Sequence, residues 1–416
     1  MMTREQLDQL VDSLIEPAVS FLQKMVRVPS ENPPGRYGDI AALIAEVFQK
    51  WGFDTQVVEA SPFLVEEEAL ENHKLNVLGR MKGREPGPTL ILCGHLDTVP
   101  AGAASAWQYR PFSGARVEEK IFGRGAVDCK GRIAAYAAAA KGLREAGLLQ
   151  KGELIVAATC DEETGGHLGA GYLLEEGILQ GDLAIVEGYG DRIARAASGL
   201  IWCYLVIKGK PVHAAYKERG INAIEQARYV LEVLEDFSRE LAKEPSQIPG
   251  IRHTSLNVGT INGGTSPNIV AEDCVLSLDL RVMPGHSLEA IYRRLEEKLL
   301  PLQEKGLVLE LIPHREVWTE PTLSPENSPV LQSLLHASAK IKGQSLPVVG
   351  VPIQSDARYF LAKGIPAVNY GPGRPENGVH GINEHLEIND LVESIKILIL
   401  AAGDLLGPGG FADAFR

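Results

Sequence analysis

The sequence contains few cysteines for its length, and no two of them are closely spaced. Five cysteines are scattered over 416 residues, mostly inside apolar segments. An odd number without a regular spacing argues against a disulfide framework and is typical of a chain in a reducing cytoplasm. Because no Cys-x-x-Cys pair occurs, the sequence also argues against a zinc site built from thiolates.

Long apolar runs and an excess of basic residues are also absent. No run is long enough to cross a bilayer. Lys and Arg number 41 against 54 Asp and Glu, and this net charge of -13 argues against a nucleic-acid or anionic-membrane partner. The first 30 residues show helical spacing but no signal-peptide pattern, so we expect a docking helix and a cytoplasmic protein. P-loop, Rossmann and nucleophile-elbow motifs are missing.

What the sequence does contain is an alternation of short apolar segments with helical ones. Residues 89–95, 153–160 and 182–188 have the apolar character of buried strands, and residues 133–147 form an alanine-rich helical segment. Strands that are apolar on both faces and separated by helices predict a parallel or mixed sheet covered on both sides. We therefore expect an α/β domain.

The pattern changes near residue 197 and returns after about residue 313. Between these points the predicted order is strand, helix, strand, strand, helix, strand, at residues 199–210, 221–243, 254–263, 275–283, 288–300 and 307–312. This βαββαβ order is that of a ferredoxin-like unit. We expect a catalytic domain of residues 1–196 and 313–416, with a lid or dimerisation domain of residues 197–312 inserted into it.

Acidic and histidine residues recur where the predicted buried strands end. Such strands are followed by His95 and Asp97, by Glu162 and Glu163, and by Glu187, while Asp128 precedes the alanine-rich segment and His380 lies in a late loop. The strand ends of an open α/β sheet converge on one crevice, where ligands bind. Burying carboxylates without matching Lys or Arg is costly, and a bound cation offsets that cost.

A charge count suggests which cation would bind. Neutral His95 and His380 with ionised Asp128, Glu163 and Glu187 carry three negative charges, which together with one hydroxide balance two divalent ions. Nitrogen and oxygen donors without thiolate favour Zn²⁺, with Co²⁺ or Mn²⁺ as alternatives. Two such ions activate a shared water and polarise a carbonyl.

Two acidic residues near these ligands suit supporting roles. Asp97 lies two residues after His95 and is placed to orient its imidazole. Glu162 and Glu163 are adjacent and point in different directions, so one can bind metal while the other acts as general base.

Taken together, the motifs resemble those of a known family. They are GHLDTVPAG at 94–102, IFGRGAVDCKG at 121–131, DEETGG at 161–166, GPG at 371–373 followed by VHGINE at 379–384, and KGKPVHAAY and GGTSPNIV in the expected insertion. The chain resembles, nearly from end to end, the dinuclear-zinc amidohydrolases and peptidases. This family includes acetylornithine deacetylase, succinyl-diaminopimelate desuccinylase, aminoacylase and glutamate carboxypeptidase.

The resemblance implies a ligand set of five residues. His95 and Glu187 would bind one ion, Glu163 and His380 the other, and Asp128 would bridge the two. The cofactor would be two divalent metal ions, most simply zinc.

The resemblance also implies catalytic roles. Glu162 would be the general base that acts on a metal-bridged water, and Asp97 would orient His95. His213 would stabilise the oxyanion and would reach the site from the inserted domain of a partner subunit, in a homodimer formed through that domain.

Further residues are implied to contact the substrate. Asn268, Arg281 and Ser355 match such positions, and an Arg fork is a suitable partner for a substrate carboxylate. The family pattern also places a cis peptide at Asp128-Cys129. The sequence departs from the pattern at Cys129, Arg132, Lys217 and Ala271, where methionine, glycine, proline and proline are usual.

These residues predict a metal-dependent hydrolase of the amide bond in a small N-acyl amino acid, of the deacetylase or desuccinylase type. A dipeptidase or carboxypeptidase with the same chemistry is the alternative, and residue types alone do not separate the two. A non-catalytic metal-binding protein that acts by interaction is a third hypothesis, which the intact Glu162 disfavours.

Overall fold

The computed structural model describes residues 2–60 and 73–408, which form two compact units. The first unit comprises Met1–Arg195, Ser324–Val348 and Ser355–Arg416. The second comprises Ala196–Leu323 and Val349–Gln354. The second unit thus extends past residue 312, where we expected the insertion to end, and includes a short later segment.

A large mixed sheet forms the centre of the first unit. Its strand order is β1-β2-β6-β3-β7-β15-β8-β13, and β14 also pairs with β8. Strand β3 runs parallel to both β6 and β7, and β15 runs parallel to β7. The strands are β1 (Asp54–Glu59), β2 (Leu75–Lys82), β3 (Glu85–His95), β6 (Lys151–Thr159), β7 (Leu183–Val186), β8 (Ile193–Ala197), β13 (Thr322–Leu323), β14 (Val348–Val351) and β15 (Ala367–Asn369).

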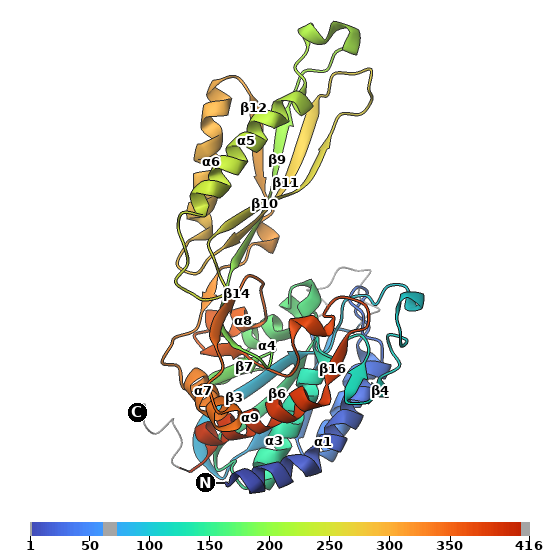
Figure 1. Cartoon of the computed structure of the whole chain (residues 1–416), viewed down its shortest axis with the longest axis vertical. Coiled ribbons are helices and arrows are strands. Elements are labelled where there is room, and N and C mark those ends of the chain that lie inside the picture. Colours follow the sequence, from blue (N-terminus) through green and yellow to red (C-terminus); the bar gives the residue numbers. More distant parts are fainter. Residues whose placement is uncertain (1, 61–72, 409–416) are drawn as a thin grey trace. The chain divides into compact units, whose positions relative to one another are not determined.

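Helices cover both faces of this sheet. Alternate residues of β3 face opposite sides, so that Leu90 and Leu92 belong to one core while Ile91 and Cys93 belong to another. Figure 1 shows the N-terminal helix α1, in blue, in the same layer as α3 and the C-terminal helix α9, in red. The first core includes α1 (Arg4–Arg27), α2 (Gly38–Lys50), α3 (Lys130–Glu145), α7 (Pro329–Lys342) and α9 (Ile388–Leu406), and the second includes α4 (Tyr172–Glu175) and α8 (Ala357–Ala362).

A small sheet links two distant loops of the first unit. Its order is β16-β5-β4, with β4 (Ala115–Val117), β5 (Lys120–Phe122) and β16 (His385–Glu387). Strand β16 pairs antiparallel with β5, with Leu386 opposite Ile121. This pairing holds the segment that follows His380 against the segment that precedes Asp128.

The second unit has the predicted βαββαβ order. It comprises β9 (Gly199–Lys208), α5 (Ala223–Leu241), β10 (Ser255–Gly263), β11 (Asp273–Val282), α6 (Leu288–Glu304) and β12 (Val308–Pro313). The sheet order is β10-β11-β9-β12, antiparallel throughout. On β9, Ile201 and Cys203 are buried with the helices, whereas Trp202 and Tyr204 are exposed. The predicted α/β fold with an inserted ferredoxin-like domain is confirmed.

In the part of the chain that the structure describes, no helix is both long enough and apolar enough to span a bilayer.

Candidate metal centre and catalytic site

The predicted ligands lie at one edge of the central sheet because three neighbouring strands are parallel. Strand β3 ends at His95, β6 ends just before the turn that carries Glu162 and Glu163, and β7 ends just before Glu187. Parallel strands bring their carboxyl ends to the same edge, where a crevice can form.

Asp128 lies at the centre of this group. Its Oδ1 is 3.1 Å from Nε2 of His95, and its Oδ2 is 3.4 Å from Nε2 of His380. The same nitrogen of His380 is 3.3 Å from Oε2 of Glu163. One carboxylate thus faces two imidazoles through separate oxygens, and Asp128 is therefore placed to be shared by two ions. The cis peptide expected at Asp128-Cys129 is present.

Glu187 lies close to two residues that are not in the predicted ligand set, Cys93 and Asp356. Ligand atoms of Cys93, Glu187 and Asp356 all lie within 4.8 Å of one another. The backbone N–H of Asp356 donates to Oε1 of Glu187 at 3.1 Å. Within residues 2–60 and 73–408, the second oxygen of Glu187 and Oδ1 of Asp356 are buried without a hydrogen-bond partner. A buried carboxylate oxygen left unpaired is costly.

The pKa values of the acidic residues at this edge reflect their burial first and their charged neighbours second. Burial, together with repulsion from Asp356, raises the pKa of Glu187 to about 8. Burial likewise raises the pKa of Asp356 to about 7 and places that of Glu162 well above its usual range. Hydrogen bonds with Asp128 and Glu163 raise the pKa of His380 to about 10. The carboxylates therefore attract positive charge.

The donor chemistry fits divalent metal ions. The unpaired oxygens and the two imidazole nitrogens are the donors that Zn²⁺, Co²⁺ and Mn²⁺ accept. Two thiols lie close to these donors, Cys129 beside His95 and Asp128 and Cys93 beside Glu187 and Asp356, and burial raises the pKa of both. His95, Asp128, Glu163, Glu187 and His380 are the residues that would hold the ions.

Asp97 was predicted to orient His95, and in the structure it also holds the turn that carries Glu162 and Glu163. Nδ1 of His95 is 3.0 Å from the backbone carbonyl oxygen of Asp97 and 3.5 Å from its carboxylate. The fully buried carboxylate accepts the backbone N–H groups of Glu162 and Glu163, at 3.3 and 3.2 Å. The carbonyl therefore orients His95, while the carboxylate holds the turn that presents the predicted base.

Glu162 is placed close to the centre. Its Oε2 is 3.9 Å from Nε2 of His95, and it occupies the first position of a short 3₁₀ turn, Glu162–Thr164. A carboxylate whose pKa is raised by burial is a stronger proton acceptor than a solvated one. The geometry thus suits the role predicted for Glu162.

Two of the remaining predicted residues, His213 and Asn268, belong to the second unit. In the second unit, Nδ1 of His213 accepts the N–H of Ala215 at 3.1 Å, and the carbonyl of Asn268 accepts the N–H of Ala214 at 2.9 Å. His213 and Asn268 therefore lie on neighbouring backbone segments, and both are exposed.

Two predicted substrate contacts already have partners within the chain. The fork of Arg281 donates to both carboxylate oxygens of Asp279, at 2.9 and 3.0 Å. In the first unit, Oγ of Ser355 accepts a hydrogen bond from Nδ2 of Asn369 at 2.8 Å. The hydroxyl of Ser355 thus helps to hold the segment that carries Asp356.

Sequence reasoning missed Glu384. This carboxylate is fully buried and accepts hydrogen bonds from Nη1 of Arg124 at 2.7 Å and from the backbone N–H groups of Gly125, Val127 and Asp128 at 3.0, 2.9 and 3.0 Å. It ties the loop of His380 to that of Asp128. The sequence shows Glu384 within the VHGINE motif, but it does not show that this side chain is buried.

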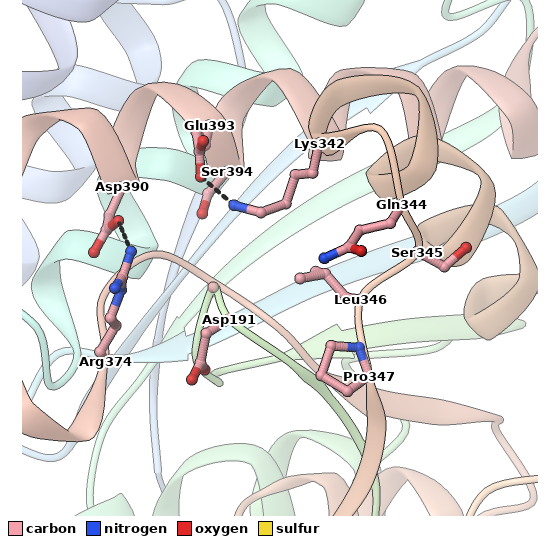
Figure 2. A pocket seen from close by; sticks show the side chains of 11 residues that line it. Asp191, Lys342, Gln344, Ser345, Leu346, Pro347, Arg374, Asp390, Glu393 and Ser394 are labelled. Atoms are coloured by element: carbon pink, nitrogen blue, oxygen red, sulfur yellow. Dashed lines mark hydrogen bonds and ion pairs between the residues drawn. The ribbon is translucent and has the colours of Figure 1, made fainter.

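A separate pocket of about 210 Å³ lies elsewhere in the first unit. Figure 2 shows Lys342 paired with Glu393 and Arg374 paired with Asp390 across its wall. These opposite charges satisfy one another, and none of the predicted ligands lines the pocket.

We expect Glu384→Gln to destabilise the protein by about 3–5 kcal/mol, the usual effect of breaking a buried charge pair. Every group that faces this carboxylate is a donor, so the amide of glutamine would turn an N–H toward another N–H or toward Arg124. Urea unfolding of the zinc-free chain measures the change.

Glu145→Gln is the matched control for this experiment. Glu145 is partly exposed and pairs with Lys141 on the surface of α3, so its replacement should change the free energy of unfolding by only about 0.5 kcal/mol. Equal stabilities of the two variants would contradict the role assigned to Glu384.

Comparison with known proteins identifies the family of this chain. The family model for peptidase family M20/M25/M40 matches residues 91–404. An N-formyl-4-amino-5-aminomethyl-2-methylpyrimidine deformylase from Halalkalibacterium halodurans is 27% identical, over 95% of this chain and 96% of its own. An acetylornithine deacetylase from Aliivibrio salmonicida is 32% identical, over 80% of this chain and 85% of its own.

A solved structure shares the fold. The M20 family metallo-carboxypeptidase Sso-CP2 from Sulfolobus solfataricus superposes with a TM-score of 0.73, covering 94% of this chain and 99% of its own at 21% identity. The chain belongs to peptidase family M20/M25/M40 and is a metal-binding hydrolase of amide bonds.

Proposed function

We propose that this protein removes a short acyl group from the nitrogen of a small amino acid or related amine. The observation that carries this proposal is the nature of the two relatives described above. Each is named for removing a formyl or acetyl group from nitrogen, and each matches at least 80% of this chain. The carboxypeptidase structure supports the fold alone, since its identity is 21%.

The chain's own residues would have distinct roles in the hydrolysis. When bound, two divalent ions would supply Lewis acidity and make water more acidic. Glu162 would accept a proton from the attacking water as the water oxygen bonds to the acyl carbon. The same carboxyl group would then give this proton to the nitrogen as the carbon–nitrogen bond breaks. The products are a carboxylic acid and a free amine.

His213 is suited to act as a hydrogen-bond donor in this reaction. Because its Nδ1 accepts the N–H of Ala215, a neutral imidazole carries its proton on Nε2. An N–H directed at the acyl oxygen would stabilise the negative charge that develops there during attack. The backbone contacts between Ala214 and Asn268 hold the segment that presents this group.

A substrate panel tests the proposal. The full chain, reloaded with zinc or cobalt, would be assayed against N-acetylornithine, N-succinyl-diaminopimelate, N-acetylmethionine, an N-formyl aminomethylpyrimidine and several dipeptides. We expect metal-restored hydrolysis concentrated on one acylated amine. Hydrolysis of dipeptides alone would overturn the deacylase proposal in favour of a peptidase with the same site.

Replacing the predicted base tests the mechanism. Glu162→Gln should lower kcat by about 10²–10⁴, the usual contribution of a general base, because the amide cannot accept the proton. Metal content, measured by elemental analysis, should stay at the wild-type value because Glu162 is not among the proposed ligands. The exposed Glu176→Gln is the control and should leave both quantities unchanged. Full activity of Glu162→Gln would exclude this residue as the base.

We further propose that the protein acts as a homodimer through its second unit, with His213 serving the site of the other copy. The exposed aromatic side chains of β9, Trp202 and Tyr204, lie on the uncovered face of that unit's sheet and are typical of an interaction surface. The sites would then be incomplete in a monomer.

Mixing two inactive variants measures this arrangement. If Glu162→Gln and His213→Ala chains are unfolded, mixed equally and refolded, heterodimers should contain one intact site each, or about a quarter of all sites. Recovered activity of that order would support the exchange of His213 between copies. No recovery, with heterodimers demonstrated by mass, would place His213 in the site of its own chain.

A further inference from the structure

Arg132 is a buried cation in contact with the central carboxylate of the proposed metal centre. Its side chain is almost fully buried, and Nη1 donates to Oδ1 of Asp128 at 2.7 Å. It lies in the first turn of α3, where the helix dipole disfavours a positive charge. Burial and the helix dipole both disfavour a positive charge at this place, so specific contacts must hold the guanidinium there.

Two loops near the ligands accommodate the side chain. The guanidinium lies 5.0 Å from the ring centre of Tyr189, two residues beyond Glu187. Gly371, in the loop after β15, leaves room for it, since a Cβ there would come within 2.9 Å of Cγ of Arg132. The side chain of Arg132 is therefore packed against an aromatic ring and against backbone without a side chain.

The contact is made with one particular oxygen of Asp128. Oδ1, which accepts from Arg132, is also the oxygen 3.1 Å from Nε2 of His95. Oδ2 faces His380 instead. A positive charge bonded to Oδ1 therefore withdraws electron density from the side of the carboxylate that His95 shares, and it repels a cation held there.

We propose that the charge of Arg132, bonded to Oδ1 of Asp128, weakens binding of the metal ion on the side of that carboxylate that faces His95. This inference rests on the metal centre of the proposed function. The two ions would then bind with unequal affinity, the weaker one beside His95. Removing the charge should strengthen the weaker binding step.

The test is a zinc titration of the full chain after chelation, in competition with a chromogenic chelator. Arg132→Met removes the charge and the hydrogen bond, Arg132→Gln removes the charge but keeps a donor, and Arg132→Lys keeps the charge. We expect the weaker zinc step to tighten about tenfold in the two neutral variants and to stay near the wild-type value in Arg132→Lys.

Arg80→Met is the matched control. Arg80 is a mostly buried arginine of β2 whose guanidinium lies 3.7 Å from the carboxylate of Glu153, so its loss removes a cation of the same unit without touching the ligands. Its zinc affinities should equal those of the wild type. Thermal unfolding of each variant identifies those that fold, and either neutral variant alone decides the outcome.

The results separate the two proposals. Unchanged or weaker zinc binding in a folded neutral variant, with two ions bound by the wild type, would overturn the role of Arg132 and leave the metal centre intact. A wild-type chain that binds no zinc, cobalt or manganese would overturn both proposals. Tightening in Arg132→Lys equal to that in Arg132→Met would show that the charge is not the cause, and would overturn the inference as well.

Discussion

Carboxylates gathered at the carboxyl ends of the parallel strands of the mixed sheet impose the constraint on which the site depends. Glu162, Glu187 and Asp356 are drawn together with little water, and each has its pKa raised by burial. Unpaired oxygens on Glu187 and Asp356 remain. Divalent cations relieve this charge, so that the same burial which costs stability creates the affinity for metal.

A second set of acidic residues is stable without metal and holds the first in place. The carboxylate of Asp97 accepts the backbone N–H groups of Glu162 and Glu163, and Glu384 accepts those of the loop that ends at Asp128. Backbone donors are fixed by the fold and do not require a mobile side chain. The geometry of the centre is therefore prepared before any ion binds, which is the arrangement expected of a preorganised site.

Charge is also adjusted from outside the ligand set. Although burial alone would raise it, contact with Arg132 holds the pKa of Asp128 well below its usual range. The Asp128 carboxylate therefore stays ionised beside a cation, while the second oxygens of Glu187 and Asp356 have no such partner among the residues that the structure describes. Neighbouring acidic groups of the same edge thus differ in proton affinity because their individual contacts differ.

From the sequence alone one can predict the order of the elements, the ferredoxin-like insertion and the residues that meet at the sheet edge. Periodicity, motifs and strand ends are local properties of the chain, so their prediction needs no tertiary contacts. It did not indicate that Glu384 is buried under three backbone amides, that the carbonyl of Asp97 is nearer to His95 than its carboxylate, or that Asp356 joins Glu187. Nor did it place the end of the second unit at Leu323 or add Val349–Gln354 to it. The tertiary structure decided these points, since burial and hydrogen-bond partners depend on segments far apart in the chain.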